Sequence, residues 1–178
     1  MNRWRRFALM SFVFVVAVIG AACGGSGSSG SSFSKIDTDA TVRDLESFIP
    51  SGLKQNKVYD VSELPGAIAA YMVYFTPAGS EPIQYELRMY PDHASAIDDG
   101  ISYADEVTGE DALLRSVDVR WEEGTKDRRG GGAFRGQLTP LYGDYAVIGN
   151  VIVLCEGRSS EQALERCEAL LLAAGIGG

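Results

Sequence analysis

The chain has 178 residues, 46% of them hydrophobic, and carries 16 Lys and Arg against 24 Asp and Glu, a net charge of −8 at pH 7. So acidic a chain is a poor partner for nucleic acid or anionic lipid headgroups, because both require clustered Lys and Arg. One histidine and three cysteines argue against an ordinary zinc site. The sequence also lacks a nucleophile elbow and a phosphate-binding loop.

The first 22 residues have the layout of a secretory signal. Three arginines precede an uncharged apolar run at residues 7–22, which closes with the small residues Gly20-Ala21-Ala22. The run is about 16 residues long, shorter than the roughly 20 that a helix needs to cross a bilayer. A cleaved signal is therefore favoured over a permanent membrane span, which remains the alternative.

The residues around Cys23 suggest how the mature chain is attached. Ala21, Ala22 and Cys23 resemble the lipobox of bacterial lipoprotein precursors, in which the cysteine is diacylated and becomes the new N-terminus; Gly20 stands where leucine is usual. The resemblance implies a membrane anchor of palmitate or similar acyl chains on Cys23. Alternatively, ordinary signal peptidase would cut the same bond and release a secreted protein.

A segment of only Gly and Ser, residues 24–32, follows Cys23. It predicts a flexible tether reaching roughly 15 Å, with a plain disordered N-terminus as the alternative. We divide the chain into a signal peptide (1–22), a lipidated cysteine with its tether (23–37) and one globular domain (38–178). Cleavage would remove three arginines, leaving 13 Lys and Arg against 24 Asp and Glu, a net charge of −11.

The first part of the domain predicts one short helix and two strands. Asp39 or Thr41 is suited to cap a helix that ends at Pro50. An edge strand is expected within residues 54–63. Residues 67–75 are apolar on both faces, which predicts a central strand.

Residues 83–90 alternate between apolar and polar side chains, which predicts an antiparallel strand with one solvated face. Residues 117–122 alternate in the same way and predict another half-exposed strand. We interpret the two polar faces as either plain solvated surface or a partner-binding surface. Its residues would be Gln84, Glu86, Arg88 and Tyr90 with Asp118, Arg120 and Glu122.

The remaining elements are two helices, a loop and a hairpin. A helix is expected from Asp92 to Gly109. Residues 124–132, with Arg135 beyond, predict a Gly-rich hairpin tip that either binds an anion or is merely kept soluble by its charge. A hairpin should turn at Gly149-Asn150, and a final helix should start at Ser159 with a capping box.

Two blocks, residues 67–107 and 145–174, each read as strand, strand and helix. This recurrence indicates either a duplicated unit or chance repetition of a common motif. We therefore predict an α+β fold, an antiparallel sheet with two or three helices packed on it, and expect both block helices on one face. Cys155 and Cys167 should point into one core, where they either form a disulfide or remain reduced.

Taken together, these features predict a membrane-anchored extracytoplasmic lipoprotein with a small binding or accessory domain of unknown ligand. We expect no enzyme activity, cofactor or metal, and no nucleic-acid partner. Two alternatives remain. One is an extracytoplasmic hydrolase that uses carboxylates only, and the other is a structural envelope protein.

Overall fold

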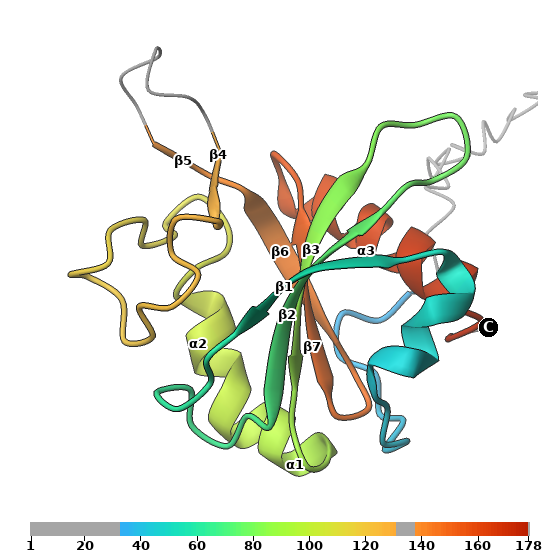
Figure 1. Ribbon diagram of the computed structural model, residues 1–178, viewed down its shortest axis with the longest axis horizontal. Helices are drawn as coiled ribbons and strands as arrows, with labels where there is room; N and C mark the ends of the chain where they lie inside the picture. The colour runs from blue at the N-terminus through green and yellow to red at the C-terminus, as the bar shows by residue number, and fades with distance from the viewer. Residues whose placement is uncertain (1–32, 131–137, 178) are drawn as a thin grey trace, which may run out of the picture. The chain divides into compact units, whose positions relative to one another are not determined.

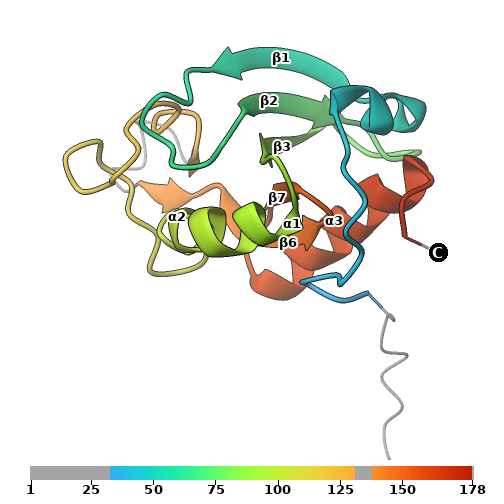
Figure 2. The same ribbon diagram turned by 90° about the horizontal axis from the view of Figure 1, so that it is seen from below.

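Five antiparallel strands form the central sheet in the order β1-β2-β3-β7-β6 (Figure 1). The computed structural model describes residues 33–130 and 138–177. Figure 2 shows the sheet curving from β1 and β2 at the top of the view to β6 at the bottom. The strands are Lys54–Tyr59 (β1), Ala69–Phe75 (β2), Ile83–Met89 (β3), Tyr142–Ile148 (β6) and Val151–Glu156 (β7).

Helices and a short ribbon complete the described fold, which confirms the predicted α+β class. The ribbon pairs Arg129–Gly130 (β4) with Thr139–Pro140 (β5). The tip of the predicted Gly-rich loop, with Arg135, lies outside the described residues. The helical segments are Leu45–Ser51 (η1, a 3-10 helix), His93–Ser95 (α1), Ala96–Gly100 (η2, a π-helical turn), Ile101–Asp105 (α2) and Ser160–Ala173 (α3).

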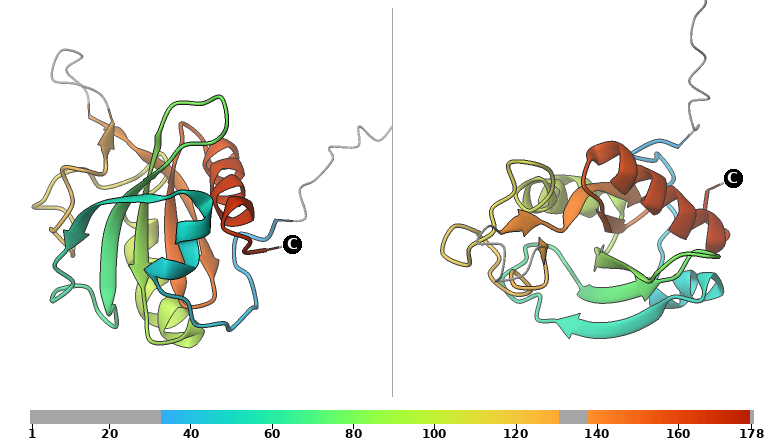
Figure 3. Two further views of the ribbon diagram at one scale, coloured as in Figure 1. Left: turned by 45° about the vertical axis from the view of Figure 1, so that its right-hand side comes forward. Right: turned by 90° about the horizontal axis from the view of Figure 1, so that it is seen from above.

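Alternate residues of β7 separate two layers of core. Val151, Val153 and Cys155 pack with α3, whereas Ile152 and Leu154 pack with the α1–η2–α2 segment. Because successive strand residues point to opposite faces, the two helical segments lie on opposite faces of the sheet. The left view of Figure 3 shows strands running between them.

The expectation that both block helices share one face is therefore wrong. Both strand-strand-helix blocks exist, as β2-β3 with α1–α2 and as β6-β7 with α3. The cause of the error is that the first five of the six residues of β7 are buried, so its two faces are equally apolar. Because neither face of β7 is polar, the sequence pattern could not show which face the following helix would cover.

The segment α1–η2–α2 is one helical stretch that follows β3. The Asp92 side chain caps it by accepting from the Ser95 backbone N–H at 2.8 Å, as predicted. Gly100 faces the sheet so closely that a Cβ atom there would lie 2.5 Å from Ile152 and 2.6 Å from Tyr90. Glycine thus permits the close packing of this segment against the sheet.

The hairpin and the start of the last helix match their predictions, but the predicted capping box forms only in part. The β6–β7 hairpin turns at Gly149-Asn150, where Gly149 has a φ of 57°. The Ser159 hydroxyl caps α3 by accepting from the Gln162 backbone N–H at 3.2 Å. The capping box is incomplete, because the Gln162 side chain accepts from the Arg158 N–H instead.

Two sequence predictions about local structure are wrong. The first helix is a 3-10 helix capped by Asp44, and Pro50 lies inside it. Residues 117–122 lie in a turn, a bend and irregular chain, not in a strand. Their alternation arises because Trp121 points into the core while Arg120 reaches outward to Glu106.

Residues just before the predicted domain start take part in the fold. Ile36 forms a parallel bridge with Val147, and Lys35 and Asp37 exchange backbone hydrogen bonds with the same residue at 2.8 and 2.9 Å. These contacts cover the free edge of β6. The folded domain therefore includes residues that the sequence pattern assigned to the tether.

Candidate functional site

The polar face of β3 is buried, so its prediction as an exposed partner surface is wrong. Glu86, Arg88 and Tyr90 are all 0% exposed, and Gln84 is half-buried. Arg120 is exposed, but it is held by Glu106 and by the Ser102 backbone rather than standing beside the others. The alternation of β3 thus reflects two buried faces of different chemistry.

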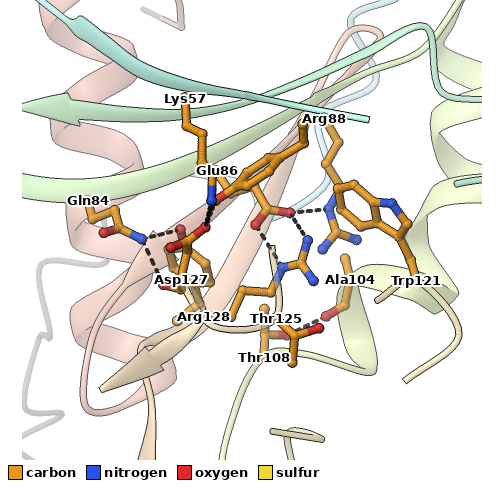
Figure 4. Close-up of polar contacts among 12 residues, drawn as sticks. Lys57, Gln84, Glu86, Arg88, Ala104, Thr108, Trp121, Thr125, Asp127 and Arg128 are labelled. Carbon is orange, nitrogen blue, oxygen red and sulfur yellow. Dashed lines mark hydrogen bonds and ion pairs between the residues drawn. The ribbon is translucent and has the colours of Figure 1, made fainter. Parts of the chain in front are cut away.

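The centre of this buried face is an ion cluster of one carboxylate and two guanidinium groups (Figure 4). Arg88 Nε donates to Glu86 at 2.7 Å. Arg128 donates to the same carboxylate twice, through Nε at 2.8 Å and Nη2 at 3.2 Å. Arg128 is 1% exposed and comes from the loop predicted to be a charged, solvated tip. Tertiary folding therefore brings two separate sequence features together.

An aromatic wall encloses the cluster. The guanidinium carbons of Arg128 and Arg88 lie 4.3 and 5.0 Å from the centroid of the Trp121 ring, within the range of cation–π attraction. Tyr59 packs edge-on against Trp121. The indole N–H donates to the Asp60 carbonyl at 3.1 Å, which fixes the ring in place. Segment 121–128 is thereby held over the face of β3.

The electrostatics of the cluster favour an ionised Glu86. Burial alone would raise the pKa of this carboxyl, but the charges and hydrogen bonds of Arg128 and Arg88 outweigh burial and lower it. A guanidinium group also remains protonated in proteins. The cluster thus holds two positive charges and one negative charge, a net excess of one buried positive charge.

Several donors of the cluster have no hydrogen-bond partner within the described residues. They are both terminal nitrogens of Arg88 and Nη1 of Arg128; the neighbouring Tyr90 hydroxyl is also unpartnered. Burial raises the pKa of Tyr90 to about 12, so at neutral pH it is an O–H group. Unsatisfied buried donors carry a free-energy cost of about 1–3 kcal/mol each, more when charged. Their presence in one place marks this cluster as the candidate site.

A cleft of about 580 Å³ lies beside the cluster. Within it, Asp127 accepts from Lys57 at 2.7 Å and from the Tyr59 hydroxyl at 3.1 Å. Its lining residues carry five carboxylates and two ammonium groups, so the cleft is acidic. They are Lys57, Asp60, Ser62, Glu63, Ser116, Trp121, Glu122, Glu123, Gly124, Thr125, Lys126 and Asp127.

The cleft and the ion cluster lie on opposite sides of the same residues. Trp121 and Gly124 line the cleft, and both also contact the cluster. A Cβ atom at Gly124 would lie 2.9 Å from Arg128 Nη2 and 3.0 Å from the Tyr59 ring. A single layer of chain therefore separates Arg128 from the cleft.

The predicted cysteine pair lies at bonding distance. Cys155 of β7 and Cys167 of α3 are joined by a disulfide with a Cα–Cα distance of 5.6 Å, and both residues are buried. Cys23 lies outside the described residues. In the described part of the chain, no three His, Cys, Asp or Glu residues gather in a way that would hold a metal ion. None of the helices described there combines the length and apolar character needed to cross a bilayer.

One signal in the sequence could have identified the buried arginines. Glu86 and Arg88 are spaced two apart on a strand, which places them on the same face and within pairing distance. A charged pair so placed, between apolar neighbours on both sides, is suited to burial as well as to solvent. No local signal linked either residue to Arg128, which lies 42 positions from Glu86.

The chain belongs to a family of unknown function, DUF6810, which it matches over residues 41–174. The matched region includes the ion cluster, the cleft and the disulfide. No curated protein and no solved structure matches the chain.

Proposed function

We propose that this protein is a lipid-anchored, extracytoplasmic lipoprotein whose domain is a binding module rather than an enzyme. The observation that carries the proposed location is the disulfide between Cys155 and Cys167. Disulfides form and persist in oxidising compartments outside the cytoplasm. This agrees with a signal segment followed by a lipobox-like Cys23 and a Gly/Ser tether.

The cleft supports a binding role. Its volume of about 580 Å³ lies in the range of small-molecule sites. Two of its carboxylates act as hydrogen-bond acceptors: Asp127 from Lys57 and Tyr59, and Asp60 from the Ser62 backbone. The hydrogen bonds from Ser62 lower the pKa of Asp60. A carboxylate kept ionised in this way suits ligand binding better than proton donation to a leaving group.

Labelling with palmitate tests the anchor. The full chain is produced in a bacterial host with labelled palmitate, beside a Cys23→Ser variant and a tether control, Ser26→Ala. We expect label and membrane association in the parent and in Ser26→Ala, and neither in Cys23→Ser. A single acyl chain holds only marginally, so stable attachment requires two or more chains.

Two outcomes would contradict the anchor. If Cys23→Ser stays in the membrane fraction, the apolar segment itself is a permanent anchor. If the parent protein appears unlabelled in the medium, the chain is secreted with a free Cys23.

A further inference from the structure

We propose that the guanidinium groups of Arg88 and Arg128 form a buried binding site for a small carboxylate. The inference goes beyond the binding role proposed above: it adds a site at the ion cluster, whose residues are not among those that line the cleft. It rests on the arrangement of donors in the cluster: the terminal nitrogens of Arg88 have no partner among the described residues, and the carboxylate beside them already accepts three hydrogen bonds.

The hydrogen bonds of Glu86 show which donors of the cluster remain without a partner. Arg128 meets Glu86 side-on through Nε and Nη2, whereas Arg88 uses Nε alone. Arg88 therefore has both terminal nitrogens, which form an end-on fork, without a hydrogen-bond partner among the described residues. This fork matches the two oxygens of a carboxylate, the geometry in which guanidinium pairing is strongest.

Charge points to an anion rather than to water alone. The cluster has two cations for one anion, and the side chains of Glu86, Arg88 and Arg128 are at most 1% exposed. Buried charge is costly unless it is paired. A second carboxylate would neutralise the excess charge and satisfy the fork, and the Tyr90 hydroxyl is a further unpartnered donor in the same layer.

Other charged groups on both sides of the cluster act on an approaching anion. Asp99 and Tyr103 influence Tyr90 from the helical side, and the cleft on the other side carries five carboxylates. An anion in the cleft is therefore repelled by the lining carboxylates and attracted by the guanidinium groups behind Trp121 and Gly124. Because salt screens the exposed charges more than the buried ones, association should become faster as ionic strength rises.

The experiment uses Trp121, which contacts both guanidinium groups, as the reporter. The chain has two tryptophans, and Trp4 lies in the signal segment that maturation would remove, so Trp121 is the only indole of the mature protein. The protein, purified in detergent, is titrated with sodium acetate. Acetamide is the neutral isostere, and sodium fluoride matches the ionic strength.

We expect acetate to change the Trp121 emission saturably and to raise the melting temperature, whereas acetamide and fluoride do neither. Arg88→Lys, which keeps the charge but removes the fork, should weaken the acetate affinity by roughly tenfold or more. The matched control is Arg120→Lys, which removes an exposed guanidinium group that lies over the Tyr103 ring. This variant should leave the acetate affinity unchanged.

Two results would overturn the proposal. If acetate acts no differently from acetamide and fluoride, the fork holds water only. If Arg88→Lys retains the full acetate response, the anion binds elsewhere. Should Arg88→Lys fail to fold, the comparison of acetate with acetamide on the parent still decides. Palmitate labelling of Cys23 is independent of every one of these results, so failure of the ligand assignment and failure of the anchor are distinguishable.

Discussion

Glu86 holds the buried face of the domain together through three hydrogen bonds to two arginines from different parts of the chain. Arg88 lies two residues away on the same strand, whereas Arg128 belongs to the segment that covers the sheet. The carboxylate thus fastens this covering segment, with Trp121, to β3. Arrangements of this kind add little net stability as a whole but are costly to break from one side.

Removing the charge of Glu86 should therefore destabilise the fold strongly. Glu86→Gln would leave two buried guanidinium groups facing each other without an anion, at a cost of about 3–5 kcal/mol in the free energy of unfolding. Urea denaturation of the parent and of Glu86→Gln measures this difference in the free energy of unfolding. Glu122→Gln, an exposed carboxylate in the same covering segment, should change stability by less than about 0.5 kcal/mol. Equal midpoints for Glu86→Gln and the parent would show that the cluster is not held as described.

At the scale of elements, β7 is the strand on which the domain is assembled. It pairs with β3 and β6, its two faces meet different helical segments, and it carries one half of the disulfide. Cys155 and Cys167 link this strand covalently to α3 across a sequence separation of 12. The bridge therefore connects the centre of the sheet to the helix that covers one face.

Loss of the disulfide should weaken the domain without changing its fold. The double variant Cys155→Ala/Cys167→Ala should lose about 3 kcal/mol of unfolding free energy, the loop-closure contribution of a bridge of this span. Intact mass with and without reductant, followed by urea denaturation, gives both measurements. The absence of a two-dalton difference in a Cys23→Ser background would show that the bridge does not form.

The β6–β7 turn is a second element whose conformation can be tested. Gly149 has a positive φ, and a Cβ atom there would collide with the Thr41 carbonyl oxygen. Gly79 also has a positive φ but faces open space. Gly79→Ala should cost about 1 kcal/mol, the usual penalty for a left-handed conformation. Gly149→Ala should cost clearly more, and equal melting temperatures for the two variants would contradict the packing of residue 41 on the turn.

At the scale of the whole molecule, acidic residues outnumber basic ones, yet several carboxylates have defined structural partners. The pKa of Asp92 is lowered by its hydrogen bonds to Ser95 at the start of α1, and the pKa of Asp44 is lowered by those to Ser47 at η1. The pKa of Glu86 is also lowered, because the charges and hydrogen bonds of its two arginines outweigh the effect of burial. The pKa shifts of these three carboxyls have the same direction, so their effects on stability add as pH changes.

The domain should be least stable in acid. A carboxyl whose pKa is lower in the folded state contributes stability above its unfolded pKa and loses it as pH falls through the folded value. Unfolding free energy should therefore decline below about pH 4.5, the ordinary pKa of Glu86. Urea titrations between pH 7 and pH 3 measure the slope. Glu86→Gln should flatten it, and an unchanged slope would show that Glu86 does not carry the acid sensitivity.

The sequence by itself determined the α+β class, the β6–β7 hairpin, the start of α3 and the capping of the helix after β3. Each depends on neighbours within a few residues: a Gly-Asn turn, Ser159 near Gln162, or Asp92 near Ser95. It also contained the reason to expect Cys155 and Cys167 in one core. These are local patterns, and local patterns can be read from a single chain.

Only the tertiary structure decided the faces of the sheet and the nature of the candidate site. β7 is apolar on both sides, so periodicity could not place its helices. The polar side chains that alternate along β3 could either face solvent or form a buried ion cluster. The choice between them depended on Arg128 and Trp121, which arrive from a segment with no strand of its own. Burial of charge requires a partner from elsewhere in the fold, and sequence spacing does not contain that information.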